Sequence, residues 1–214
     1  AMTGLKALGF AGCNLTLPHK IEALPWIDEA DPMAKRIGAV NTLTVRADGS
    51  LHGANTDAFG FIQSLREAHR SWQASAGPAV VLGAGGAARA VVWALADAGV
   101  KDIRLLNRSP EKAQAMAQEF RAPVKALAWS ERHAALEDAT LLVNTHPRYA
   151  GSASLGLATR CLTCPCFGVR HCLHPFANRF VAACCCAWQP HGEWFGHVVA
   201  PSQTSVCFLV WCLA

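Results

Sequence analysis

The chain has 214 residues, of which 52% are hydrophobic and 16% charged, and its formal net charge is +4. This composition supports a hydrophobic core and excludes intrinsic disorder. No apolar run reaches the ~18 residues of a membrane-spanning helix, no secretory signal pattern is found, and no Lys/Arg cluster indicates a nucleic-acid partner. We therefore expect a cytoplasmic protein without membrane or nucleic-acid partners.

The composition changes abruptly near residue 150. Residues 1–150 contain 30 charged residues and one cysteine, Cys13, whereas residues 151–214 contain 4 charged residues and nine cysteines. We therefore treat the chain as three segments, over residues 1–74, 75–150 and 151–214.

The first segment predicts short strands and helices. Its apolar and polar residues alternate in a way that predicts strands over residues 12–17, 38–45 and 51–55. Asp48-Gly49 is typical of a hairpin turn, so the last two strands are expected to be antiparallel. Two amphipathic helices are expected, with buried faces formed by Ile21, Leu24 and Ile27 and by Phe59, Ile62 and Leu65.

Five polar residues of this segment are candidates for a site: Asn14, Thr16, Lys20, Asn41 and Asp57. A lysine and an aspartate at converging ends of elements can form a proton-transfer pair, because the carboxylate holds the ammonium where a substrate oxygen needs it. The alternative is a surface lysine and an aspartate that caps a helix. Spacing alone favours this alternative.

The second segment predicts a βαβ unit. An apolar run over residues 78–82 is typical of a buried parallel strand, and residues 87–98 are expected to form a helix that ends before Gly99. Further elements are expected over residues 103–106, 111–120 and 141–145. The intervening G-x-G-x-x-A turn lets backbone N–H groups approach a pyrophosphate at the start of the helix, through Gly83, Ala84, Gly85, Gly86 and Ala87. The alternative is a tight turn that binds no cofactor.

The end of the second strand of this unit indicates the type of cofactor. An NAD site usually has Asp or Glu at this place, which accepts hydrogen bonds from the ribose hydroxyls. Here the chain has Asn107, Arg108 and Ser109, followed by Lys112. Since Arg108 and Lys112 can pair with a 2′-phosphate, the sequence predicts NADP.

Five motifs in this order resemble the shikimate/quinate dehydrogenase family. They are N-L-T-L-P-H-K at 14–20, G-A-V-N-T at 38–42, N-T-D at 55–57, the glycine-rich turn at 83–87, and N-R at 107–108. The resemblance implies reversible hydride transfer between NADPH and the C3 ketone of 3-dehydroshikimate, giving shikimate for aromatic amino acid biosynthesis. It implies a metal-free site in which Lys20 and Asp57 are catalytic and Thr16, Asn41 and Asn14 bind the substrate.

The resemblance also implies an α/β fold of two domains. A substrate-binding domain over residues 1–74, without the family's opening strand and Ser-x-Ser motif, would precede a doubly wound Rossmann-type NADP-binding domain over residues 75–150. The family's later Gly-Met loop and D-G-x-x-M-L-x-x-Q-A helix are absent after Thr145, so the second sheet is expected to keep its first half and expose an apolar edge. The alternatives are a non-catalytic NADP-binding remnant and a quinate/shikimate dehydrogenase. The oligomeric state is not readable from the sequence.

Two interpretations of the chain beyond about His146 compete. A shifted reading frame explains why the family motifs stop where the composition changes. The alternative is a zinc module, whose ligands would come from Cys161, Cys164, Cys166, His171, Cys172 and His174. Structural zinc sites usually use two spaced pairs of ligands, which Cys184-Cys185-Cys186 does not fit, so we favour the shifted frame.

The shifted-frame hypothesis predicts a result at the level of DNA. Translation of the gene across codons 140 to 155 in all frames should restore the Gly-Met loop, and further on the D-G-x-x-M-L-x-x-Q-A helix, in another frame. If no frame restores them, the tail is genuine protein sequence, and metal analysis before and after chelation then tests the zinc module.

Overall fold

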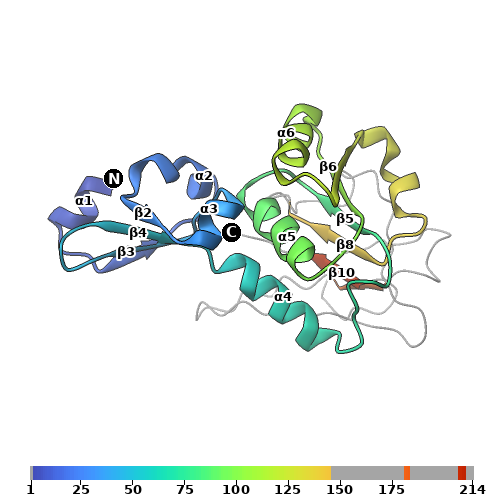
Figure 1. The fold of residues 1–214 in the computed structure, drawn as a ribbon, viewed down its shortest axis with the longest axis horizontal. Helices are drawn as coiled ribbons and strands as arrows, with labels where there is room; N and C mark the ends of the chain where they lie inside the picture. The colour runs from blue at the N-terminus through green and yellow to red at the C-terminus, as the bar shows by residue number, and fades with distance from the viewer. Residues whose placement is uncertain (1, 146–180, 184–206, 211–214) are drawn as a thin grey trace, which may run out of the picture.

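The computed structural model describes residues 2–145, 181–183 and 207–210. Two β-sheets organise these residues (Figure 1): a four-stranded sheet of order β1-β3-β4-β2 and a six-stranded sheet of order β7-β6-β5-β8-β10-β9. The expected α/β class is confirmed. Among the described residues, no helix is long and apolar enough to cross a membrane.

The smaller sheet is built around the predicted hairpin. Its strands are β1 (Gly12–Asn14), β2 (Glu29–Ala30), β3 (Thr42–Val45) and β4 (Leu51–Ala54). The hairpin turns at Gly49, whose φ is +79°, so β3 and β4 are antiparallel; β1 is antiparallel to β3, and β2 is parallel to β4. Helix α1 (Met2–Ala7) precedes β1, and short helical elements connect the following strands: α2 (His19–Glu22), η1 (Leu24–Trp26) and α3 (Pro32–Ile37).

Some elements of this part are shorter than expected. The first strand ends at Asn14, and the strand expected over residues 38–45 begins at Thr42, because Gly38 ends helix α3 with a left-handed φ of +67°. The helix expected after Pro18 is divided into α2 and η1, since Pro25 has no N–H to continue an α-helix. Ile21 was expected to be buried, and this was wrong: it is 40% exposed.

The larger sheet is parallel, with β5 and β8 as its two central strands. Its strands are β5 (Ala79–Leu82), β6 (Ile103–Leu106), β7 (Val124–Leu127), β8 (Leu141–Asn144), β9 (Val181–Ala183) and β10 (Cys207–Val210). All residues of β5 and β8 are buried, which explains why β5 is entirely apolar and why β8 is apolar up to Asn144. Helices α5 (Gly86–Asp97) and α6 (Pro110–Phe120) agree with expectation, whereas β7, η2 (Trp129–Arg132) and η3 (Ala134–Leu136) were not predicted.

The edge of β8 is paired, so the expectation that the sheet keeps only its first half was wrong. Strand β10 lies parallel to β8, with Cys207 opposite Leu141, and β9 lies parallel to β10. The physical reason is that an edge strand presents unpaired N–H and C=O groups, which the backbone of an added strand satisfies. The proposed zinc ligands at 161–174 and the triplet at 184–186 lie outside the described residues.

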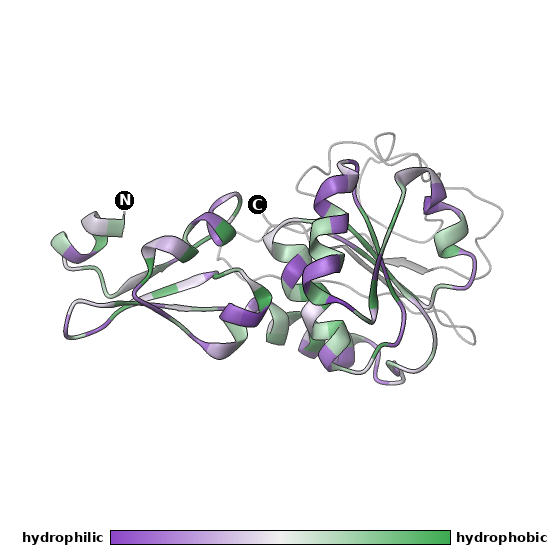
Figure 2. Cartoon of the chain, turned by 45° about the horizontal axis from the view of Figure 1, so that its top comes forward, coloured by the Kyte–Doolittle hydropathy of each residue, from purple (hydrophilic) through white to green (hydrophobic). Residues whose placement is uncertain are grey.

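Helix α4 (Asp57–Ala68) connects the two sheets and packs along α5 (Figure 1). Its buried face uses Phe61 and Leu65, whereas Phe59, expected to be buried, is 65% exposed. The main hydrophobic cluster also includes Ile37 and Ala39 from the smaller sheet's side of the molecule. Figure 2 shows hydrophilic and hydrophobic residues on the same helices, as expected for helices that bury one face.

Candidate active site

Three of the sequence motifs meet at one end of the smaller sheet. Asn14, the last residue of β1, lies opposite Thr42, the first residue of β3, and Thr42 lies opposite Ala54, the last residue of β4. The chain then enters α4 through Asn55 and Thr56. Antiparallel pairing therefore brings residues that are distant in sequence to one edge.

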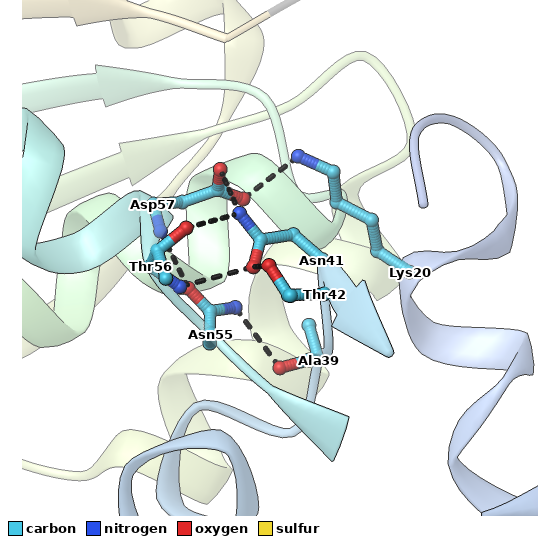
Figure 3. Close-up of polar contacts among 7 residues, drawn as sticks. All are labelled: Lys20, Ala39, Asn41, Thr42, Asn55, Thr56 and Asp57. Atoms are coloured by element: carbon cyan, nitrogen blue, oxygen red, sulfur yellow. Dashed lines mark hydrogen bonds and ion pairs between the residues drawn. The ribbon is translucent and has the colours of Figure 1, made fainter. Parts of the chain in front are cut away.

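Lys20 and Asp57 form a buried ion pair at this edge (Figure 3). The Lys20 Nζ donates to Asp57 Oδ2 at 2.7 Å, and the two side chains are 3% and 9% exposed. This geometry contradicts the alternative of a surface lysine and an aspartate that only caps a helix. Asp57 is the first residue of α4, and the N-cap residue Thr56 makes no side-chain capping bond.

The amide of Asn41 orients the carboxylate of Asp57 (Figure 3). Its Nδ2 donates to Asp57 Oδ1 at 2.8 Å and to Thr56 Oγ1 at 2.9 Å. Its Oδ1 accepts from the Thr56 N–H and from Thr42 Oγ1, both at 3.0 Å. Both carboxylate oxygens of Asp57 thus have a donor, and the amide of Asn41 uses its full hydrogen-bonding capacity within the protein.

Asn55 fixes the start of α4, a role that the sequence reasoning missed. Its side chain is buried, with Nδ2 donating to the Ala39 carbonyl at 2.9 Å and Oδ1 accepting from the Asp57 N–H at 3.0 Å. The signal was present in the N-T-D motif, because an Asn two residues before a helical Asp can form this local turn. Asn55 therefore sets the position from which the Asp57 side chain extends.

The other two candidate substrate residues lie beside this network. Asn14 and Thr16 are exposed. Between them, the Leu15 N–H donates to the Asn41 carbonyl at 2.7 Å, so the backbone of this segment runs alongside Asn41. The structure thus brings all five candidates of the first segment to one end of the sheet.

The glycine-rich turn between β5 and α5 borders the ion pair. Gly83 has a φ of +112°, a conformation that favours glycine. At Gly85 an added Cβ would meet no atom within 4 Å, which leaves space for a group at the start of the helix. An added Cβ at Gly86 would lie 2.9 Å from Lys20 Cβ. The open space at Gly85 fits a dinucleotide pyrophosphate. Gly86, the next residue, packs against the side chain of Lys20.

The end of β6 presents two cations. Arg108 and Lys112 are exposed, and neither forms an ion pair with another residue in the part of the chain that the structure describes. The Asn107 side chain donates to the Ser109 carbonyl at 3.0 Å and so shapes the turn that carries Arg108. This arrangement fits a phosphate group on the ribose of a dinucleotide.

Comparison with known proteins agrees with this geometry. Residues 1–43 match the family profile "Shikimate dehydrogenase substrate binding domain", and residues 66–147 match "Shikimate / quinate 5-dehydrogenase". Over 141 residues the chain is 56% identical to the shikimate dehydrogenase (NADP(+)) of Paramagnetospirillum magneticum, an alignment that covers 66% of this chain and 51% of that protein. The chain belongs to the shikimate dehydrogenase family.

Two solved structures of this family are also similar. Shikimate 5-dehydrogenase from Thermus thermophilus, in complex with NADP(H) and shikimate, has a TM-score of 0.57 and 42% identity, over 68% of this chain and 51% of that one. Quinate dehydrogenase from Corynebacterium glutamicum, in complex with NAD, has a TM-score of 0.62 and 32% identity, over 68% and 53%. The chain spans about half the length of the family members it matches.

The burial of the ion pair predicts how its removal affects stability. Lys20→Met or Asp57→Leu leaves one buried charge without its partner, so each should lower the free energy of unfolding by about 3–5 kcal/mol, whereas the double variant should recover much of the loss. Urea denaturation measures all three. Lys6→Met, which breaks the exposed pair with Asp28, is the control and should barely move the urea midpoint. Additive losses in the double variant would contradict a buried pair.

Proposed function

We propose that this chain catalyses the NADP-dependent shikimate dehydrogenase reaction, reversible hydride transfer between NADPH and the C3 ketone of 3-dehydroshikimate. One observation carries the proposal: Lys20, whose ammonium forms the buried pair with Asp57, packs its Cβ and Cδ against Gly86, the first residue of helix α5 in the glycine-rich turn. A proton donor and a dinucleotide-binding turn are therefore adjacent, as reduction of a ketone requires. The two proposed domains are residues 1–74 and 75–150, and the proposed location is the cytoplasm.

Lys20 supplies the proton in this mechanism. When bound, NADPH provides the hydride. As negative charge develops on the C3 oxygen, the Lys20 ammonium donates a hydrogen bond and then the proton to it; in the reverse direction the amine takes the proton from the hydroxyl. One of the three N–H groups of Lys20 bonds to Asp57, which leaves two donors for the substrate.

Asp57 and Asn41 hold Lys20 in place for this step. The carboxylate of Asp57 fixes the ammonium through Oδ2, while Asn41 fixes the carboxylate through Oδ1. We assign Asn14 and Thr16 to the substrate hydroxyls, because both residues are exposed and their segment runs alongside Asn41. Since the amide of Asn41 is fully hydrogen-bonded, its contact with a substrate would replace a bond to Thr42 or Thr56.

The proposed cofactor is NADP. The turn formed by Gly83 to Ala87 would hold the pyrophosphate, and Arg108, with Lys112 and the turn at Asn107 and Ser109, would hold the 2′-phosphate. The similarity to a quinate dehydrogenase bound to NAD supports a second candidate, oxidation of quinate. The cation at position 108, in the place where an NAD site usually has a carboxylate, favours the first candidate.

Replacement of Lys20 tests the proposed mechanism. In the full chain, Lys20→Met should lower kcat for NADPH oxidation with 3-dehydroshikimate by about 10²–10⁴-fold, the range for loss of a general acid, while the Kd for NADPH stays the same. Lys35→Met, an exposed lysine on α3, is the matched control and should keep full activity. A wild-type chain that binds NADPH without oxidising it would establish the non-catalytic remnant instead.

Replacement of Arg108 tests the cofactor. A charged hydrogen bond contributes about 1.5–3 kcal/mol, so Arg108→Gln should raise the Kd for NADPH by about 10- to 100-fold and leave that for NADH unchanged. Fluorescence titration measures both constants. Lys101→Gln, an exposed cation before β6, serves as the control. Equal weakening for both cofactors would mean that Arg108 does not contact the 2′-phosphate.

A further inference from the structure

The backbone conformation at Gly86 does not require a glycine. It is the first residue of α5, and its φ is not in the left-handed region, so alanine fits the helix and is the better helix former. Its surroundings, however, exclude a side chain. An added Cβ would lie 2.9 Å from Lys20 Cβ, 3.6 Å from Lys20 Cδ and 3.7 Å from Ile21 Cγ1.

The nearest of these atoms has little freedom to move. Lys20 Cβ is attached to the main chain of α2, so a side chain at residue 86 displaces the helix and not a flexible side-chain end. The Lys20 carbonyl accepts from the Val40 N–H at 2.8 Å, and the Lys20 ammonium is bonded to Asp57. A displacement of α2 therefore moves Lys20 relative to Asp57 or strains both bonds.

A second contact of α5 holds the segment that bonds to the Lys20 carbonyl. One turn after Gly86, the Arg89 Nε donates to the Ile37 carbonyl at the end of α3, and the Arg89 guanidinium pairs with Glu119 and lies over the ring of Phe120. The segment from Ile37 leads in three residues to Val40, which bonds to Lys20. The start of α5 thus holds Lys20 both directly and through α3.

We infer that Gly86 is a positioning residue for Lys20. The missing side chain sets how closely α2 approaches the start of α5, and so where the Lys20 ammonium stands relative to the cofactor-binding turn. Gly85 differs, because space remains open around it. This inference rests on the proposed function for its catalytic consequence, and on the contact between Lys20 and Gly86 for its structural one.

Matched alanine variants separate the roles of the two glycines. In the full chain, Gly86→Ala should lower kcat with 3-dehydroshikimate by about 10- to 100-fold, as expected for a displaced catalytic group, with the Kd for NADPH changed less than about twofold. Gly85→Ala should show the opposite pattern, with a raised Kd for NADPH. If Gly86→Ala changes only the Kd, then Gly86 serves the cofactor and the inference is overturned.

A chemical probe tests the inference without turnover. Reductive methylation, followed residue by residue by mass spectrometry, should be slow at Lys20 in the wild type, where its side chain is 3% exposed, and faster in Gly86→Ala. Lys125, whose side chain is 65% exposed, should react equally in both. A wild type without activity would refute the proposed function, while this rate would still decide the inference: an unchanged rate at Lys20 overturns it.

A further variant tests the inference if the Gly86→Ala protein does not fold. In that case Gly86→Ala is combined with Lys20→Gly and Asp57→Leu, which removes the Cβ on the opposite side of the contact without leaving a buried carboxylate unpaired. Folding of this triple variant to the same extent as Lys20→Gly combined with Asp57→Leu supports the inference. A triple variant that is clearly less stable than that double variant means that the conflict lies with another neighbour of Gly86, and the inference is wrong.

Discussion

The buried contact between the Lys20 ammonium and the Asp57 carboxylate imposes conditions on most of the first half of the molecule. Removing two charges from water is costly, and their attraction offsets this cost only when the geometry is good and further hydrogen bonds satisfy the remaining groups. Asp57 meets this condition through Asn41 and through its own N–H, which bonds to Asn55. Asn41 reaches Asp57 because β3 begins opposite the end of β4. A shift of one residue in that pairing would turn the side chains of β3 to the other face of the sheet and separate the network.

The sequence was sufficient for elements that depend on local patterns. The apolar run of β5, the helix that ends before Gly99 and the hairpin at Asp48-Gly49 were predicted from neighbouring residues, and the structure has all three. The ion pair depends on residues separated by 37 positions in the chain. Spacing therefore favoured an exposed lysine and a helix cap, and the resemblance of motifs, not local chemistry, identified the pair.

Packing between elements explains the errors. In α4, both Phe59 and Phe61 belong to apolar stripes at helical spacing, so periodicity alone does not determine which one is buried. The contact of α4 with α5 buries Phe61 and leaves Phe59 exposed. Strand β10 shows a second limit: an edge strand can be paired through backbone groups alone, which makes few demands on sequence. The change of composition in the tail therefore did not predict that four residues of it would pair with β8.

The glycine-rich turn shows how one short motif can meet separate physical demands. Gly83 satisfies the backbone, since its φ is +112°. Gly85 leaves space at the helix start, and Gly86 leaves space for Lys20. A proton donor is effective when it is held in position before the substrate arrives, because the order of its flexible side chain is then part of the folded state. In this chain Asp57 accepts a hydrogen bond from the ammonium of Lys20, and Gly86 leaves space for the Cβ of Lys20. The motif that indicates a dinucleotide in the sequence thus also determines, through the packing of α2 on α5, how near the ammonium of Lys20 stands to the glycine-rich turn.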